Sequence, residues 1–164
     1  MTRLVASAII REFRDADGSS VLVLANPEIE RSRYRGALRA TVDALIAHKD
    51  PDSRALIATL DRQLAGVVIF GHTAGADGAG RLQLVVTHPG SRRAGIASAL
   101  VEASVEVLRR NGARFAAVEM PDDPELAQVM ALLARCGFSV DARVRDFYRD
   151  GVDLALFRRS LIEG

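Results

Sequence analysis

The sequence has little cysteine and no long apolar run, the features that mark disulfide-bonded and membrane-spanning proteins. Its single cysteine, Cys136, cannot form a disulfide within the chain, and we interpret it as a small buried hydrophobe. No apolar run approaches the roughly 18 residues that a membrane-spanning helix needs, and the amino terminus lacks the pattern of a signal peptide. These absences predict a cytoplasmic protein without disulfides.

An excess of charge of one sign is also missing. The chain has 22 Lys and Arg residues against 21 Asp and Glu residues, which gives a net charge of +1. This balance gives no electrostatic reason to expect nucleic acid or a membrane as partner. The histidines His48, His72 and His88 lack the spacing of metal ligands, so we expect no metal. The 164 residues suffice for one core and are too few for two, so we expect a single domain over residues 1–164.

The most informative stretch predicts a buried strand, a tight loop and a helix. Residues 82–86 are apolar except for Gln83, which suits a strand buried on both faces. A loop of small and basic residues follows Pro89. From Ile96 onward the apolar residues recur at helical spacing, and the helix is expected to end near Asn111.

The start of this helix is a candidate phosphate site. The first N–H groups of a helix have no intrahelical partners and carry partial positive charge. Gly95 and its small neighbours would let an anion approach that backbone, and Arg92 and Arg93 add full charges. The loop is neither a Walker loop nor a Gly-x-Gly-x-x-Gly fingerprint. An ordinary strand–helix connection, in which glycine only serves packing, is the alternative.

The rest of the chain predicts a mixture of strands and helices. Amphipathic helices are expected from Tyr34 to the break before residue 50, and over residues 126–135. The run 21–24 is ambiguous between strand and short helix, and residues 71–80, with four glycines, are expected to form one flexible loop. Strands are expected over residues 5–13, 55–60, 64–70, 114–119, 138–145 and 152–159, with hairpin turns at 61–63 and 149–151, and with 114–119 parallel to the central strand.

The loop motif resembles a known signature. Arg92-x-x-Gly95-x-Ala97, preceded by a strand and Pro89, resembles the acetyl-CoA signature of the GNAT superfamily of N-acetyltransferases. In that family glycine is commoner at the last position and alanine is an accepted variant.

Two further features carry the same resemblance. Gly137-Phe138, just after the second carboxy-terminal helix, resembles the Gly-Phe pair commonly found there, and the expected order of elements matches over essentially the whole chain. The resemblance implies a bacterial single-domain member with an α/β fold. Its mixed central sheet would be splayed between the fourth and fifth strands and flanked by helices. It also favours helix for the ambiguous run 21–24.

In this family acetyl-CoA binds at the gap between the splayed strands. The resemblance implies that the pantetheine arm pairs with the backbone of Val85 and Thr87. It also implies that backbone N–H groups hold the pyrophosphate, with Arg93 as the main side-chain contact to phosphate. The implied cradle consists of Arg92, Arg93, Ala94, Gly95, Ile96, Ala97 and Ser98.

The implied reaction is direct attack of an amine on the acetyl thioester. A primary alkyl amine has a pKa of about 10.4, so near neutral pH it must first lose a proton. A carboxylate can take that proton directly or through a water. Glu119, at the end of the strand over 114–119, resembles the glutamate that many family members carry there and is the candidate base. A carboxylate at the rim, paired with an arginine, is the alternative.

The usual acid of the family is absent. Leu133 stands where many members carry a tyrosine, and Leu126 stands where they often carry an asparagine that contacts CoA. Tyr148, in the expected terminal hairpin, is the candidate acid, and Cys136 is a weaker one. A half-buried hairpin tyrosine without a catalytic role is the alternative for Tyr148.

Other functions and partners stay open at this level. An intact CoA site without a proton-transfer pair would suit a catalytically weak acetyl-CoA sensor or regulatory module, whereas a nucleotide-binding domain is disfavoured because no Mg²⁺-ligating Ser/Thr follows the loop. The amine acceptor could be a small molecule, a protein amino terminus or a lysine. The acidic cluster Asp122, Asp123 and Glu125 suits either a cationic amine or a solvated helix start. Apart from the apolar terminal hairpin, the sequence contains no feature that indicates a homodimer.

Overall fold

The computed structural model describes residues 8–91 and 95–163. These residues form a mixture of strands and helices, with short 3-10 helices η1 (Asp15–Asp17), η2 (Pro89–Ser91) and η3 (Pro124–Leu126) between them. In chain order the longer elements are β1 (Ile9–Glu12), α1 (Gly18–Arg31), α2 (Arg35–Ile46), β2 (Ser53–Leu60), β3 (Gln63–His72), β4 (Ala79–Thr87), α3 (Ile96–Arg110), β5 (Phe115–Pro121), α4 (Ala127–Arg135), β6 (Ser139–Arg149) and β7 (Val152–Ser160).

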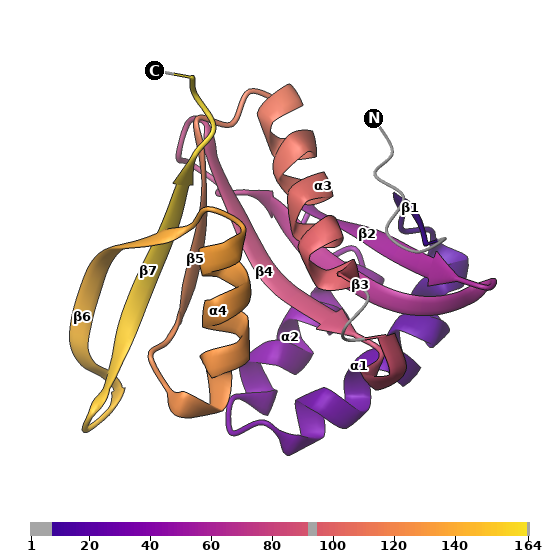
Figure 1. Ribbon diagram of the computed structural model, residues 1–164, viewed down its shortest axis with the longest axis horizontal. Coiled ribbons are helices and arrows are strands. Elements are labelled where there is room, and N and C mark those ends of the chain that lie inside the picture. The colour runs from indigo at the N-terminus through magenta and orange to yellow at the C-terminus, as the bar shows by residue number, and fades with distance from the viewer. Residues whose placement is uncertain (1–7, 92–94, 164) are drawn as a thin grey trace.

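The strands form one mixed sheet in the order β1-β2-β3-β4-β5-β7-β6. β4 and β5 are parallel, and the other neighbouring pairs are antiparallel. Figure 1 shows α3 and α4 on one face of this sheet and α1 and α2 on the other, and each face has its own buried apolar cluster. The expected α/β fold is confirmed. Within the described residues no helix is both long enough and apolar enough to cross a membrane.

The ambiguous run of the sequence lies in α1 and is helical, as the resemblance implied. Val21, Leu24, Ala25 and Ile29 are buried at helical spacing against the sheet, whereas Val23 is 75% exposed. Strands would have placed alternate residues inward. Burial of one helical face therefore outweighs the β-propensity of the valines.

The glycine-rich segment is not the single flexible loop that the sequence predicted. β3 continues to His72 and β4 begins at Ala79, so only residues 73–78 connect the two strands. A Cβ atom added to Gly71 would stand 1.9 Å from the carbonyl oxygen of Asp52. Glycine serves here to let β3 approach closely the backbone that leads into β2. The expectation of a loop was wrong at both ends of the segment.

The terminal hairpin was predicted correctly, but its first strand is longer than expected. β6 runs to Arg149 instead of ending at Arg145. Its pairing with β7 is interrupted between Val144 and Arg149, where Asp146 has a left-handed φ of 52°. β6 is an edge strand and is exposed along nearly all of its length.

The expected splay between the fourth and fifth strands is present. Three residue pairs hold β4 and β5 together, the last between Arg81 and Ala117. Immediately beyond, the β3–β4 register gains one residue at Gln83, which is a β-bulge. A bulge bends its strand, and Figure 1 shows β4 and β5 diverging toward the end of β4. The bulge therefore explains why the pairing stops where it does.

Candidate active site

On the side of β4 that faces the gap, the backbone groups beyond Arg81 do not pair with β5. The His88 N–H donates to the Ala65 carbonyl oxygen of β3 at 2.7 Å. Because N–H and C=O groups alternate between the two sides of an antiparallel strand, those of Val86 also face β3. Those of Val85 and Thr87 then face the other side, where β5 no longer pairs with β4. An extended chain could form strand-like hydrogen bonds there.

A half-buried polar side chain with a buried oxygen lies at the head of the same gap. The Gln83 side-chain oxygen is buried without a hydrogen-bond partner in the described part of the chain. A buried acceptor without a donor is costly, so such groups are usually satisfied by a ligand or water. The amide-bearing pantetheine arm of CoA has the donors and acceptors that this gap lacks. The gap therefore fits that group chemically.

The helix start that the sequence singled out has open backbone donors. Gly95 precedes α3 with a left-handed φ of 73°, and the first helical bond runs from the Ala99 N–H to the Gly95 carbonyl oxygen at 3.0 Å. Ile96 is buried in the core, so only its backbone can serve a ligand, while Ala97 and Ser98 are half-buried. No acidic residue occupies the first turn. This end of α3 favours an anion.

Three of the predicted cradle residues cannot be compared with the structure. Arg92, Arg93 and Ala94 lie outside the described residues. Their predicted roles stay predictions.

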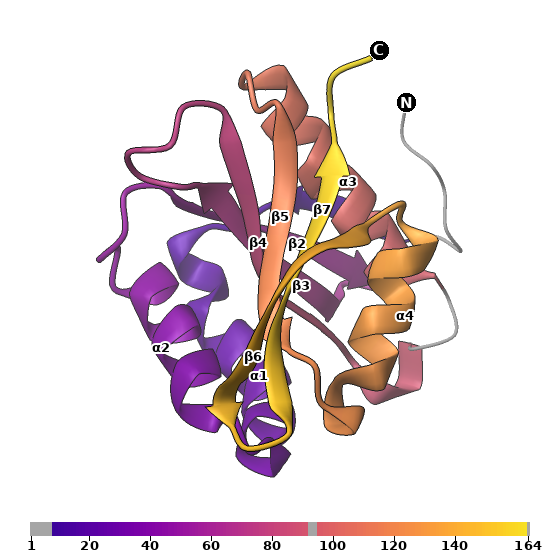
Figure 2. The ribbon, with the colours of Figure 1, turned by 90° about the vertical axis from the view of Figure 1, so that its left-hand side faces the viewer.

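The two candidate catalytic side chains lie on the same face of the sheet. On β5, Ala116 and Met120 point into the cluster below α3 and α4, so Glu119 points to the opposite face, toward α1 and α2. The Tyr148 ring makes an edge-to-face contact with Tyr34, at the start of α2, with 5.7 Å between the ring centroids. In the view of Figure 2 the β6–β7 hairpin faces the viewer, with α2 seen on one side of it and α4 on the other.

Neither Glu119 nor Tyr148 has a hydrogen-bond partner for its side chain among the described residues. The Glu119 carboxylate is exposed and has no hydrogen bond or ion pair in the part of the chain that the structure describes. The Tyr148 hydroxyl likewise has no hydrogen-bond partner among those residues. The pKa of Tyr148 is raised by burial first, and then by the charge of Glu119 and by Tyr34. The Glu119 carboxylate is therefore close enough to the Tyr148 hydroxyl to disfavour its ionisation.

A buried carboxylate that sequence reasoning did not assign fixes this arrangement. The Tyr34 hydroxyl donates to Asp123 Oδ2 at 2.6 Å and accepts from Arg149 at 2.8 Å, and Arg149 also donates to Asp123 Oδ2 at 2.7 Å. These bonds, Tyr34 first, hold the pKa of Asp123 well below its ordinary value. The network joins the start of α2, the β5–α4 connection and the hairpin. No local sequence signal relates Asp123 to Arg149, which is 26 residues away.

The other acidic residues of the predicted cluster are also engaged. Asp122 pairs with Arg143 on β6. The Glu125 oxygens accept from the Arg33 N–H at 2.9 Å and from the Ser32 hydroxyl at 3.2 Å. The expectation of a solvated helix start was wrong for Asp123, which is buried. Asp122 is partly exposed and Glu125 is exposed, although both also bind neighbouring segments.

Tyrosine titration offers a first test of this geometry. The chain has two tyrosines, Tyr34 and Tyr148, and the pKa of each is raised above the ordinary value of 10.0. Because the fold favours the neutral phenols, their contribution to stability is present below pH 10 and is lost as the pH rises through the higher folded pKa. We expect both midpoints of the 295-nm absorbance to lie above 10. In the Tyr34→Phe variant only Tyr148 titrates. Adding Glu119→Gln to that variant should lower the midpoint of Tyr148, because the charge that raises its pKa is removed.

The positions where the family usually has polar residues are apolar and packed. Leu133 is buried in the core between α3 and α4, and Leu126 packs against the same cluster. Cys136 is a free, buried thiol whose pKa is raised by burial, which confirms its interpretation as a small core residue. None of the three presents a polar group to the gap. Within the described residues, no group of three His, Cys, Asp or Glu side chains could hold a metal ion.

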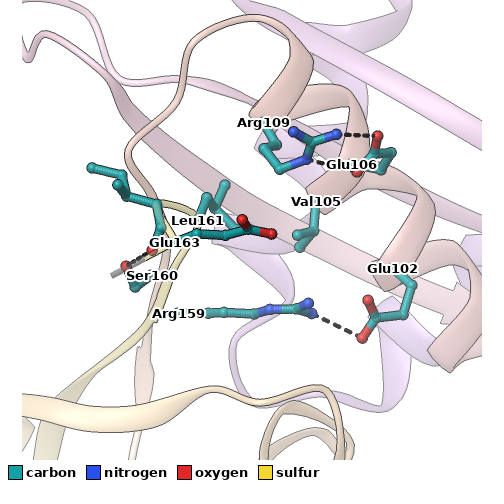
Figure 3. Close-up of a pocket in the computed structure, with 9 residues that line it drawn as sticks. Glu102, Val105, Glu106, Arg109, Arg159, Ser160, Leu161 and Glu163 are labelled. Carbon is teal, nitrogen blue, oxygen red and sulfur yellow. Dashed lines mark hydrogen bonds and ion pairs between the residues drawn. The ribbon is translucent and has the colours of Figure 1, made fainter.

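Two cavities lie outside the gap. One, of about 320 Å³, lies beside the second half of α3, and four of its charged side chains pair as Arg109–Glu106 at 2.7 Å and Arg159–Glu102 at 2.8 Å (Figure 3). It adjoins Ser160, which pairs with the first residue of β5, so it lies at the closed end of the β4–β5 pair. The other, a groove of about 680 Å³, runs along α1 and ends at His88 and Pro89.

Comparison with known proteins agrees with this geometry. A GNAT-family protein from Desulfovibrio desulfuricans superimposes with a TM-score of 0.83 at 23% identity, over 94% of this chain and 99% of that chain. The protein yncA from Salmonella typhimurium, solved with its cofactor acetyl-CoA, gives 0.75 at 18%, over 96% of each chain. The aminoglycoside 6′-N-acetyltransferase from Enterococcus faecium gives 0.78 at 14%, over 95% of this chain and 98% of that chain. At sequence identities of 14–23% these similarities establish a shared fold and nothing more specific.

The sequence itself supplies the assignment to a family. No curated protein matches the chain significantly. The model of the acetyltransferase (GNAT) family matches residues 10–138, which is most of the chain. The protein therefore belongs to the GNAT acetyltransferase family.

Proposed function

We propose that this chain, as a single N-acetyltransferase domain over residues 1–164, transfers the acetyl group of acetyl-CoA to an amine by direct attack. The observation that carries the proposal is the position of the Glu119 carboxylate, which has no hydrogen-bond or ion-pair partner among the described residues. It lies on β5, beyond the last β4–β5 pair, on the sheet face that Tyr148 shares. An open gap and an acid–base pair are the two requirements of the reaction.

The backbone supplies the binding of the cosubstrate. In the proposal, Val85 and Thr87 hydrogen-bond the pantetheine arm through their free N–H and C=O groups, and the open N–H groups at the start of α3 hold the pyrophosphate. The cradle comprises residues 92–98, with Arg93 as the side-chain contact to phosphate. Acetyl-CoA supplies the activated thioester; no metal is needed for the step.

Glu119 and Tyr148 move the protons. Glu119 accepts the proton of the ammonium, directly or through a water, so that the amine can form the new N–C bond. The C–S bond breaks, and Tyr148 gives its proton to the departing thiolate. The second amine proton returns to the phenolate, and the overall products are the amide, free CoA and one proton. A thiol with a pKa of about 8.5 is a fair leaving group, which lessens the demand on the acid.

A catalytically weak acetyl-CoA sensor or regulatory module is the second candidate. The burial of Leu133 at the family's usual acid position favours it. Binding of acetyl-CoA without transfer to any amine would distinguish the sensor from the enzyme.

The proposal includes the cellular setting and the partners. The acceptor is an amine-bearing small molecule or protein group, the protein works in the cytoplasm, and it engages neither nucleic acid nor membrane. A homodimer would form through the exposed edge strand β6, where Val140 and Val144 are 41% and 49% exposed. Open strand edges readily pair with a second chain.

Calorimetric titration with acetyl-CoA and free CoA tests the cosubstrate. The wild type is expected to bind with micromolar affinity. Gly95→Glu is expected to weaken binding by at least about a hundredfold, because a carboxylate beside the pyrophosphate site repels it. Gly75→Glu is the matched control, since Gly75 has a similar φ of 76° in the β3–β4 loop and open space around it.

Each outcome has a defined meaning. Equal loss in both variants would show that backbone strain, and not the cradle, causes the effect. No binding by a folded wild type would overturn the enzyme and the sensor together.

A further inference from the structure

The Tyr148 ring, on the sheet face that Glu119 shares, belongs to an exposed aromatic patch, which we define as Tyr34, Phe147 and Tyr148. The Phe147 and Tyr148 rings meet edge to face with 5.1 Å between centroids, and Tyr148 meets Tyr34 in the same way. Phe147 is 57% exposed and Tyr148 38% exposed. A ring so exposed in a fixed position is available to a ligand.

The backbone below the patch is fixed by hydrogen bonds. The Asp146 N–H donates to the Asp153 side chain at 3.0 Å, and the Gly151 N–H donates to the Asp146 side chain at 2.8 Å. Arg149 anchors the same segment to Asp123. The segment that carries the rings is therefore held in place before any ligand arrives, which reduces the entropy lost on binding.

The sheet surface between Glu119 and the tip of the β6–β7 hairpin is apolar. Residues that oppose one another directly across strands share a face. Leu156 of β7 opposes Glu119, and Ala142 of β6 opposes Leu156. The next row on this face is Pro121, Leu154 and Val144. Glu119 is thus bordered by apolar side chains toward the hairpin tip, while Arg158, which opposes Ala117, lies in the row on its other side.

The neighbouring acids offer no further site for an ammonium group. The carboxylates of Asp122, Asp123 and Glu125 already bind Arg143, Arg149 and the Ser32–Arg33 segment. On β5 and its connection to α4, Glu119 is the acidic side chain left without a partner among the described residues. One open carboxylate suits one ammonium group, since each ammonium needs its own acceptor.

We propose, building on the acetyl transfer proposed above, that the acceptor carries its amino group on an aromatic or other flat apolar body. That body packs against Phe147 and Tyr148, and the ammonium faces Glu119. The aromatic faces also attract the cation itself. Polyhydroxylated and polycationic amines are poor acceptors, because their polar groups would lie against the apolar rows without partners.

A panel of three amines tests this inference: 2-phenylethylamine, ethanolamine and spermidine. Release of the CoA thiol measures kcat and KM, and tyrosine emission in the presence of free CoA measures amine binding. The emission reports on the patch alone, because the chain has two tyrosines, both in it, and no tryptophan. We expect kcat/KM for 2-phenylethylamine to exceed that for the other two amines at least about tenfold.

Two variants locate the effect. Phe147→Ala is expected to raise KM for 2-phenylethylamine about tenfold while leaving ethanolamine, spermidine and the calorimetric affinity for acetyl-CoA unchanged. Val140→Ala, another exposed apolar residue of β6, is the control and should change none of these.

The outcomes separate this inference from the proposed function. Preference for spermidine or ethanolamine, or no response to Phe147→Ala, would overturn the inference while acetyl-CoA binding stands. Failure of all three amines to bind a protein that binds acetyl-CoA would do the same. Conversion of a dimer to a monomer by Phe147→Ala, seen by light scattering, would show that the patch is occupied by a second copy. Loss of acetyl-CoA binding in the wild type would instead overturn the proposed function.

Discussion

Glu119→Gln is expected to lower kcat/KM for an amine acceptor by a factor of about 10²–10⁴ near pH 7.5. Glutamine keeps the size of the side chain but cannot accept a proton. The acceptor must then arrive as the free amine, which is a small fraction of the total at this pH. The calorimetric affinity for acetyl-CoA is expected to stay unchanged, because the proposed cosubstrate contacts lie on β4 and α3.

The pH dependence distinguishes a base from a residue that only shapes the site. The free fraction of an amine with a pKa of about 10.4 rises about a hundredfold between pH 7.5 and 9.5. The variant should recover activity over this range, so that its deficit against the wild type shrinks. A deficit that is constant with pH would remove Glu119 from the role of base. Glu12→Gln, an exposed glutamate of β1 at the opposite edge of the sheet, is the matched control.

Gly71→Ala is expected to destabilise the fold by at least about 3 kcal/mol, the upper end of typical overpacking effects. The new Cβ would stand 1.9 Å from the Asp52 carbonyl oxygen and 2.9 Å from its carbon. Both atoms belong to backbone, so no side-chain rotation relieves the clash. Urea denaturation measures the loss, and Tm should fall by about 6–12 °C.

Gly36→Ala is the control for this prediction. Gly36 lies in the first turn of α2, and an added Cβ meets nothing within 4 Å. Alanine there should leave stability unchanged or raise it by up to about 1 kcal/mol, because glycine is the poorer helix former. Destabilisation by both variants would mean that the cost does not come from the contact with Asp52.

Local patterns predicted most of the elements. The apolar run before Pro89 and the 3.6-residue period after Ile96 each depend on neighbours in sequence, so β4 and α3 were found where expected. Gly95 and Gly137 adopt positive φ at the helix start and end where the sequence had placed them. Where glycine served close packing and not a turn, as at Gly71, the same reasoning failed, because composition does not show which backbone lies opposite.

The sequence by itself determined the order of the elements, the loop motif before α3 and the presence of a carboxylate at the end of β5. The tertiary structure decided the splay, since a one-residue bulge at Gln83 depends on the register with β3. It also decided which side chains meet. Tyr34 and Asp123 are 89 residues apart, and their contact with Arg149 sets the place of Tyr148 relative to Glu119. Such contacts depend on how whole strands and helices pack, and no local pattern of residues encodes that packing.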